Sequence, residues 1–151
     1  MSIESILKRQ VVVCKPTDEL TSAARLMREK HVGYVVVVEP DVEAGSFRPA
    51  GVITDRDIVV AVVAAEANPK GLRVSDVMSS KPVVISEFVS TGEAVRQMRQ
   101  IGVRRLPVIG KRGELVGVVS LDDILDKLAA ELQDVASSIR NEQRIEGALR
   151  T

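Results

Sequence analysis

An internal repeat sets the strongest limit on how this chain can fold. A shift of 71 residues aligns ARLMREKHV at 24–32 with VRQMRQIGV at 95–103. Further along the chain, a shift of 66 residues aligns GVITDRDI at 51–58 with GVVSLDDI at 117–124. The shift changes between two apolar runs, where a surface loop can differ in length at little energetic cost. We therefore expect two copies of one supersecondary unit.

Both copies have the same predicted order of elements, which is strand, helix, strand, strand, helix. The strands are rich in β-branched residues, and the second and third strands of each copy are spaced for a hairpin. The predicted strands are 11–14, 34–39 and 50–54 in the first copy and 83–85, 105–109 and 115–120 in the second. The final helix of each copy begins at Asp55 or at Leu121, directly after the third strand.

This order predicts an α/β (α+β) fold of two β-α-β-β-α repeats packed around a pseudo-twofold axis. A single unit of this size is too small for a secure core, whereas two units can bury their sheets against each other. We expect repeat one to span residues 1–70, repeat two residues 71–133, and a C-terminal helical extension residues 134–151. Packing of this kind leaves two equivalent clefts between the copies.

Capping residues predict where the first helix of each copy begins. In the first copy we expect the helix to open at Thr17 or Asp18. In the second copy Ser90 would cap the helix, with Glu93 completing a capping box.

The last helix carries one apolar face, whose residues recur at steps of three and four. As far as Leu132 this face should belong to the core. Beyond that point two interpretations stay open for Val135 and Ile139, which are contact with a second subunit or a partly exposed tail.

Composition and charge argue against several classes of function. Lys+Arg and Asp+Glu both total 21, so the formal net charge is zero, which argues against nucleic acid or an anionic membrane as a partner. The apolar runs are too short to span a bilayer, and residues 1–10 do not resemble a secretory signal. Cys14 is the only cysteine, which excludes an internal disulfide and favours a buried structural thiol. We expect a cytoplasmic protein.

No combination of nucleophile, base and orienting group stands out. The chain holds one histidine, one cysteine and one tyrosine. No cysteine or second histidine lies near His31 in the sequence to share a metal ion. We therefore expect no catalysis, no metal site and no required cofactor.

Both copies place a hydroxyl and a carboxylate three residues apart where a strand gives way to a helix. The pairs are Thr54 with Asp57 and Ser120 with Asp123. The simplest interpretation is a helix cap, worth about 1 kcal/mol. The alternative is a ligand site, because the free N–H groups of a helix start suit phosphate and a carboxylate can bind a ribose diol.

A glycine precedes each pair by the same distance. Gly51 and Gly117 lie inside predicted strands, where glycine is costly unless something approaches the backbone closely. Because both copies keep the whole motif while their loops differ, the glycines favour the ligand interpretation.

The repeats resemble a tandem pair of cystathionine-β-synthase (CBS) domains, often called a Bateman module. The resemblance covers nearly all of residues 1–132 and rests on the order of elements, on VSDVM at 74–78, on GVRRLPVI at 102–109 and on G-h-h-[ST]-x-x-D in both copies. It implies a non-catalytic regulatory module of the standalone bacterial or archaeal type. Such modules bind AMP, ADP or ATP, or NAD(H) or S-adenosylmethionine, and pass a conformational change to a regulated protein. The resemblance also implies a homodimer.

Carried over by position, the resemblance implies roles for single residues. Asp57 and Asp123 would bind the ribose hydroxyls, and Thr54 and Ser120 would help to hold phosphate. Adenine would lie against apolar side chains near the first strand of each copy, for which the candidates are Val12, Val13, Val83 and Val84.

Arginines would select the number of phosphates. Arg56 lies inside the first motif, and the family places a residue at the position of Arg105 near the phosphate of the site whose ribose acid lies in the other repeat. The resemblance thus assigns Thr54, Arg56, Asp57 and Arg105 to one site, which should be the stronger of the two.

The second site departs from the family pattern. It has Leu121–Asp122 where the first motif has Asp55–Arg56, so it lacks the basic residue and gains an acid beside Asp123. We expect this site to be empty or to prefer a neutral nucleoside.

Two other functions compete with nucleotide sensing. In the first, the chain is a dimerising interaction scaffold whose hydroxyl–acid pairs only cap helices. In the second, weaker alternative, Arg104, Arg105, Lys111 and Arg112 bind nucleic acid, which the neutral net charge disfavours.

Overall fold

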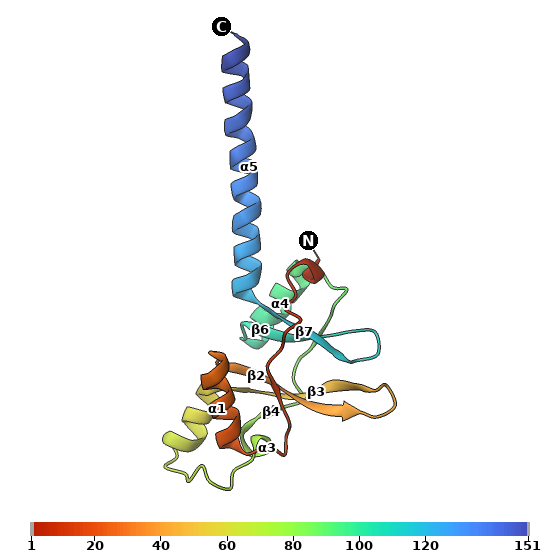
Figure 1. Ribbon diagram of the computed structural model, residues 1–151, viewed down its shortest axis with the longest axis vertical. Helices are drawn as coiled ribbons and strands as arrows, with labels where there is room; N and C mark the ends of the chain where they lie inside the picture. Colours follow the sequence, from red (N-terminus) through yellow and green to blue (C-terminus); the bar gives the residue numbers. More distant parts are fainter. Residues whose placement is uncertain (1, 151) are drawn as a thin grey trace.

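The computed structural model describes residues 2–150 and contains two small sheets, each flanked by helices (Figure 1). The strands are β1 (Val13–Cys14), β2 (Tyr34–Asp41), β3 (Ser46–Thr54), β4 (Ser79–Ser80), β5 (Ile85–Ser86), β6 (Arg105–Ile109) and β7 (Leu115–Ser120). The helices are α1 (Leu20–Lys30), α2 (Asp55–Ile58), α3 (Val74–Val77), α4 (Thr91–Ile101) and α5 (Leu121–Leu149). A 3-10 turn, η1 (Ile3–Ser5), lies near the start of the chain, and a π-helical turn, η2 (Val59–Val63), directly follows α2.

The two sheets repeat one topology, which confirms the predicted α+β fold of two β-α-β-β-α units. In the first sheet β1 is parallel to β2, and β2 forms an antiparallel hairpin with β3. In the second sheet β5 is parallel to β6, and β6 forms an antiparallel hairpin with β7. The first sheet has one additional strand, because β4 pairs with β3.

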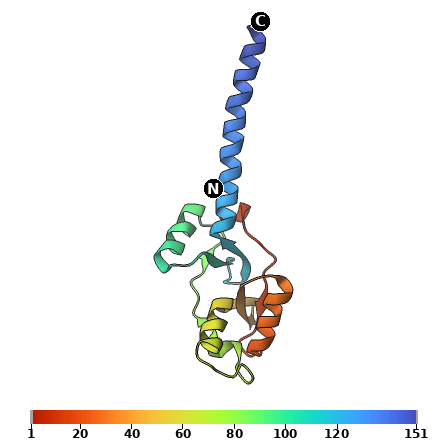
Figure 2. The same ribbon diagram turned by 90° about the vertical axis from the view of Figure 1, so that its left-hand side faces the viewer.

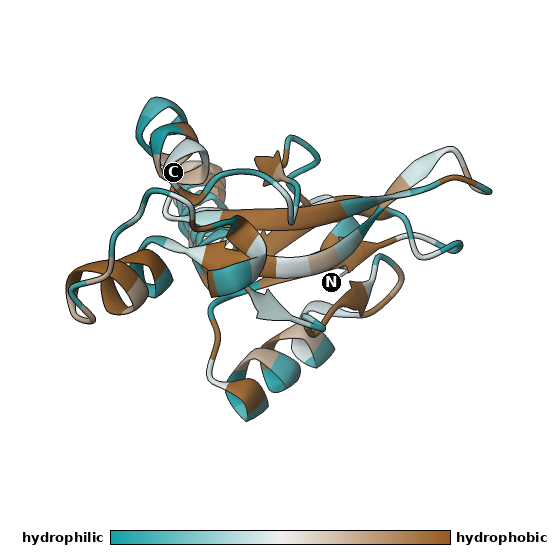
Figure 3. Ribbon diagram, turned by 90° about the horizontal axis from the view of Figure 1, so that it is seen from below, coloured by the Kyte–Doolittle hydropathy of each residue, from teal (hydrophilic) through white to brown (hydrophobic). Residues whose placement is uncertain are grey.

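The two cores exchange segments, so boundaries in the sequence differ from boundaries in space. Ile3 is fully buried in the core that contains β5, β6 and β7. Val74, from the start of the second repeat, is fully buried in the core of the first. The exchange ties the repeats together, because neither core is complete without a segment of the other repeat. Figure 3 shows the apolar strands in the middle of the body and polar residues at the loop tips.

The start of one helix differs from the prediction. α1 begins at Leu20 rather than after Thr17 or Asp18, and its N-cap residue Glu19 makes no side-chain capping bond. The Asp18 carboxylate instead accepts a hydrogen bond from the backbone N–H of Lys15, 2.8 Å away.

At α4, Ser90 caps the helix as predicted, since its hydroxyl accepts from the N–H of Glu93. The Glu93 carboxylate, however, pairs with Arg96 on the next turn. The sequence pattern assigned this carboxylate to a reciprocal capping box, but it forms a local salt bridge instead.

The expectation that α5 belongs to the core as far as Leu132 is wrong. Ile124 is buried, whereas Leu125, Leu128 and Leu132 are all exposed. The helix leaves the body and continues without interruption to Leu149 (Figures 1 and 2). Among residues 2–150, no helix combines the length and the apolar character needed to cross a membrane.

Candidate functional site

Thr54 and Asp57 form a reciprocal capping box where β3 turns into α2. The Thr54 hydroxyl accepts a hydrogen bond from the N–H of Asp57, 3.1 Å away, and Asp57 Oδ2 accepts from the N–H of Thr54 at 2.8 Å. Thr54 and Asp57 therefore cap α2, as the first interpretation predicted. Asp57 Oδ1 has no hydrogen-bond partner among the described residues, so the carboxylate retains an oxygen for other contacts.

Ser120 and Asp123 occupy the same place between β7 and α5, with a different arrangement of bonds. The N–H of Asp123 donates to the Ser120 hydroxyl at 3.1 Å, and this hydroxyl donates to Asp123 Oδ2. Asp123 Oδ1 forms a salt bridge with Lys8 Nζ at 2.7 Å. Burial alone would raise the pKa of Asp123, but the hydrogen bonds from Lys8 and Ser120 lower it below its usual range. Both oxygens of Asp123 are thus occupied.

A cavity of about 930 Å³, which we call cleft one, brings residues of both repeats together. From repeat one it is lined by Thr54, Arg56 and Asp57, and from repeat two by Arg105 and Val83. The four residues that the sequence assigned to one site therefore line one cavity. Its volume falls in the usual range for small-molecule sites, about 300–1,000 Å³.

Basic side chains outnumber acids in cleft one. Arg56, Lys81, Arg104 and Arg105 line it. Arg104 is paired with Asp122 at 2.7 Å, whereas Arg56 and Arg105 make no ion pair with any described residue. Exposed guanidinium groups without acidic partners are suited to bind an anion.

A second cavity of about 370 Å³, cleft two, contains Ser120 and Asp123. Two further acids, Asp122 and Asp126, line it, and the facing basic side chains are Lys8 and Arg105. Three acids therefore line cleft two, and two, Asp55 and Asp57, line cleft one.

One wall separates the clefts. Gly33, Tyr34 and Arg105 line both cavities, and the Arg105 guanidinium lies 6.0 Å from the centre of the Tyr34 ring. Tyr34 is the counterpart of Arg105 under the 71-residue shift. The phenol and the guanidinium are thus shared by both clefts.

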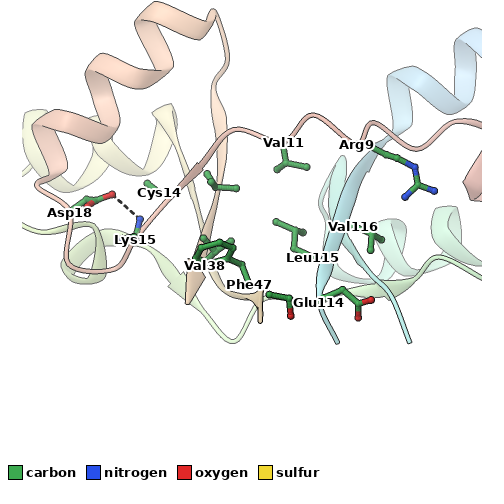
Figure 4. Close-up of a pocket in the computed structure, with 12 residues that line it drawn as sticks. Arg9, Val11, Cys14, Lys15, Asp18, Val38, Phe47, Glu114, Leu115 and Val116 are labelled. Carbon is green, nitrogen blue, oxygen red and sulfur yellow. Dashed lines mark hydrogen bonds between the residues drawn. The ribbon is translucent and has the colours of Figure 1, made fainter. Parts of the chain in front are cut away.

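The four candidate valines separate into two groups. Val83 lines cleft one and Val12 lines cleft two. Val13 lines neither cleft; it lines a third cavity of about 490 Å³, which lies beside the segment that leads into β1 (Figure 4). Val84 is half-buried and lines none of these cavities. Residues 10–12 line cleft two and residues 81–83 line cleft one, so each cleft borders the segment that precedes β1 or β5.

The third cavity holds no hydroxyl–acid pair of the kind found in the clefts. Val11, Val38, Phe47 and Leu115 form its apolar middle (Figure 4). Cys14 lies at one end and is buried, and burial together with the nearby Asp18 carboxylate raises the pKa of its thiol to about 11. The prediction of a buried structural thiol is confirmed.

The chain's own backbone, and not a ligand, accounts for the two motif glycines. A Cβ atom on Gly51 would lie 2.8 Å from the carbonyl oxygen of Ser79, and one on Gly117 would lie 2.7 Å from that of Lys8. Both carbonyls belong to extended segments that pair with the glycine-bearing strand. The glycines thus give no support to the ligand interpretation that they favoured at the sequence level.

Several cleft residues were not predicted. Lys81 lines cleft one, and Lys8 and Gln10 line cleft two. The repeat itself contains the signal, since the 71-residue shift aligns Gln10 with Lys81 and Val12 with Val83. In each aligned pair, the residue of repeat one lines cleft two and the residue of repeat two lines cleft one. Among residues 2–150, no group of histidine, cysteine or acidic side chains is arranged to hold a metal ion.

Comparison with known proteins supplies the family. A sequence model of the CBS domain matches residues 3–64 and 74–130. An uncharacterized protein of Methanopyrus kandleri is 36% identical over 125 residues, which make up 83% of this chain and 61% of that protein. A CBS domain-containing protein of Bacillus subtilis is 33% identical over 123 residues, 82% of each chain. The solved structure of a CBS domain protein from Pyrobaculum aerophilum complexed with AMP is 29% identical, with a TM-score of 0.72 over 86% of this chain and 99% of that one.

Proposed function

Because this chain belongs to the CBS domain family, we propose that it is a non-catalytic regulatory module that binds an adenine nucleotide in cleft one. Binding would change the relative packing of the two repeats, and a regulated protein would respond to that change. The observation that carries the proposal is the meeting of Thr54, Arg56 and Asp57 with Arg105 in one cavity.

Each cleft residue has a suitable chemical role. Asp57 Oδ1 would accept hydrogen bonds from the ribose diol while Oδ2 keeps its capping bond to Thr54. The Arg105 and Arg56 guanidinium groups would bind phosphate oxygens, and Val83 would contact the adenine ring. The relative from Pyrobaculum aerophilum, which was solved with AMP, supports this choice of ligand class.

We propose that cleft one fills first and that cleft two binds weakly or prefers a neutral nucleoside. A ribose at Asp123 would have to displace Lys8, whose salt bridge already holds Oδ1. Phosphate would also meet the acids Asp122 and Asp126. We further propose that the protein is a cytoplasmic homodimer.

The competing function is a scaffold without nucleotide, in which both hydroxyl–acid pairs act only as caps. The capping box at Thr54 is the observation that favours it. The two functions differ in their response to ligand, because a bound ligand stabilises the folded state and a helix cap requires none.

A thermal-shift screen tests the proposal. AMP, ADP, ATP, NAD and S-adenosylmethionine are added separately, with inorganic phosphate and guanosine monophosphate as controls. A ligand at one hundred times its dissociation constant stabilises the folded state by about 2.7 kcal/mol, which is readily measured. We expect a shift with at least one adenine ligand and none with phosphate. The absence of any adenine-dependent shift would leave the scaffold as the function.

Replacing the shared arginine should separate recognition of phosphate from recognition of the nucleoside. We expect Arg105→Gln to weaken AMP binding about 10- to 100-fold, because a hydrogen bond to a charged group contributes about 1.5–3 kcal/mol. Adenosine affinity should change little. Isothermal titration calorimetry with both ligands measures the difference.

The matched control for this experiment is Arg99→Gln, since Arg99 is exposed on α4 and lines neither cleft. Equal losses for AMP and adenosine in Arg105→Gln would mean that Arg105 supports the shape of the cleft. An unchanged AMP affinity would exclude it as a phosphate ligand.

A further inference from the structure

α5 is far longer than the helix at the same place in repeat one, and it leaves the body of the protein. It runs without interruption from Leu121 to Leu149, and two perpendicular views show it projecting away from both sheets (Figures 1 and 2). At 1.5 Å per residue, the part beyond Leu125 extends about 36 Å. Packing against other elements supplies most of the stability of protein helices, and this helix has little of it within its own chain.

One face of the projecting helix is apolar and exposed. The steps between its residues are three, four, three and four, so they occupy the a and d positions of a heptad repeat. The exposed fractions are 65% for Leu125, 44% for Leu128, 71% for Leu132, 59% for Val135 and 52% for Ile139. We call these five residues the α5 seam. The next two positions of the heptad hold Glu142 and Glu146, which end the apolar stripe.

We propose that the α5 seam packs against the same seam of a second copy of this chain, as a parallel two-stranded coiled coil. A spacing that averages 3.5 residues keeps a stripe facing a partner helix only when two helices supercoil around each other. This contact gives the proposed homodimer a specific interface, and it does not depend on nucleotide binding.

The residues beside the seam permit a pair of identical helices. Ala129 and Ala136 lie on one flank, and Glu131 and Ser138 lie on the other. In a parallel pair, Glu131 would face Ala136 of the partner subunit, so no like charges meet there. Small flanking side chains also allow the two backbones to approach closely.

An antiparallel pair fits less well. One antiparallel alignment of the two α5 helices pairs apolar residues at every a and d position, and it places Leu121 opposite Ile139 of the second copy. Residues 140–149 of the second copy would then continue past the start of α5. The body of the protein lies at that end of the helix (Figure 1). Moving the second copy outward by one heptad sets Leu125 against Glu142, which buries a carboxylate against leucine. The parallel pair keeps both bodies at one end of the coiled coil, and it places Glu142 beside Glu142 of the partner subunit only beyond the apolar seam.

The first test measures the mass of the full-length protein by size-exclusion chromatography with light scattering. We expect a dimer for the natural chain and a monomer for the double variant Leu128→Glu/Leu132→Glu. Both leucines are exposed in the single chain, so the variant should remain folded. The matched control is Ala130→Glu/Ser137→Glu, which adds the same two charges to the opposite face of α5 and should stay dimeric. A monomeric natural chain, or a dimer that the seam charges leave unchanged, would overturn the proposal.

The second test reports the direction of the helices. A disulfide requires Cα atoms within about 7 Å. Ile139→Cys should cross-link to itself on mild oxidation of a parallel pair, whereas the two antiparallel registers would hold these residues at least roughly 16 Å apart. Cys14 is buried and resists oxidation, so the natural chain serves as the background. Ser137→Cys, on the opposite face, should remain monomeric on a non-reducing gel. Equal cross-linking of both variants, or of neither, would overturn the parallel arrangement.

Discussion

Asp57→Asn should sharply reduce the thermal shift that an adenine nucleotide produces while leaving the fold nearly as stable as before. The asparagine carbonyl can still accept the hydrogen bond that Thr54 N–H now donates to Asp57 Oδ2. What disappears is the negative charge, which is worth about 0.3–1 kcal/mol at a helix start. Loss of charged hydrogen bonds to a ribose diol should weaken binding about 10- to 100-fold. Calorimetric titration with AMP measures the affinity, and thermal unfolding without ligand measures the stability.

Asp76→Asn is the control that separates capping from binding. The Asp76 carboxylate accepts a hydrogen bond from the N–H of Arg73 at 2.7 Å, the same bond that Asp57 makes to Thr54. Asp76 lines neither cleft. Both variants should therefore lose a similar small amount of stability, and only Asp57→Asn should lose affinity for AMP. If both bind AMP as the natural chain does, the Asp57 carboxylate acts only as a helix cap and is not a ribose ligand.

The repeat made most of the fold predictable. Aligning the two copies sharpened weak local signals, so the predicted hairpin strands 105–109 and 115–120 coincide with β6 and β7. The exchange of segments between the cores was not predictable in this way. Nothing in the local sequence around Ile3 says that it packs with Met98 and Val108 rather than with its own repeat. Such a choice depends on contacts between residues that are far apart in the chain.

The face of α5 was misjudged because periodicity identifies an apolar stripe without identifying what covers it. Leu125 and Leu132 obey the helical pattern as well as the buried Ile124 does. The body simply ends after the first turn of the helix. The same signal therefore predicted the stripe correctly and its location in the core wrongly.

The candidate site was predictable where the repeat aligned the ends of predicted strands with the starts of predicted helices. The hydroxyl–acid pairs lie at the predicted strand-to-helix junctions. Strand periodicity could not have separated Val12 and Val83 from Val13 and Val84, because the consecutive residues 10–12 line cleft two and 81–83 line cleft one. The salt bridge of Lys8 with Asp123 could not be predicted from the sequence, because it joins residues of different repeats.

Gly117→Ala should destabilise the protein, because the added methyl group would collide with the segment that crosses β7. Its Cβ would overlap Leu7 Cδ1 and lie 2.7 Å from the carbonyl oxygen of Lys8. That oxygen accepts the N–H of Val118 at 3.0 Å, and Lys8 N–H donates to the Val118 oxygen at 3.1 Å. The leucine tip can move, whereas the backbone carbonyl can yield only by giving up this pair of bonds. Overpacking of this kind costs about 1–3 kcal/mol.

Thermal unfolding should show the loss as a midpoint lower by roughly 3–10 °C for a chain of this size. Gly147→Ala is the matched control, since a Cβ there meets nothing within 4 Å and lies inside α5. Alanine is favoured over glycine in a helix by about 1 kcal/mol, so this variant should unfold no earlier than the natural chain. The two substitutions add the same methyl group. Their unfolding midpoints should change in opposite directions only because the chain's own backbone lies close to Gly117 and not to Gly147. Equal midpoints would mean that the segment holding Lys8 is free to move away from β7. Asp123 would then be open to ligand, and the proposed order in which the clefts fill would be wrong.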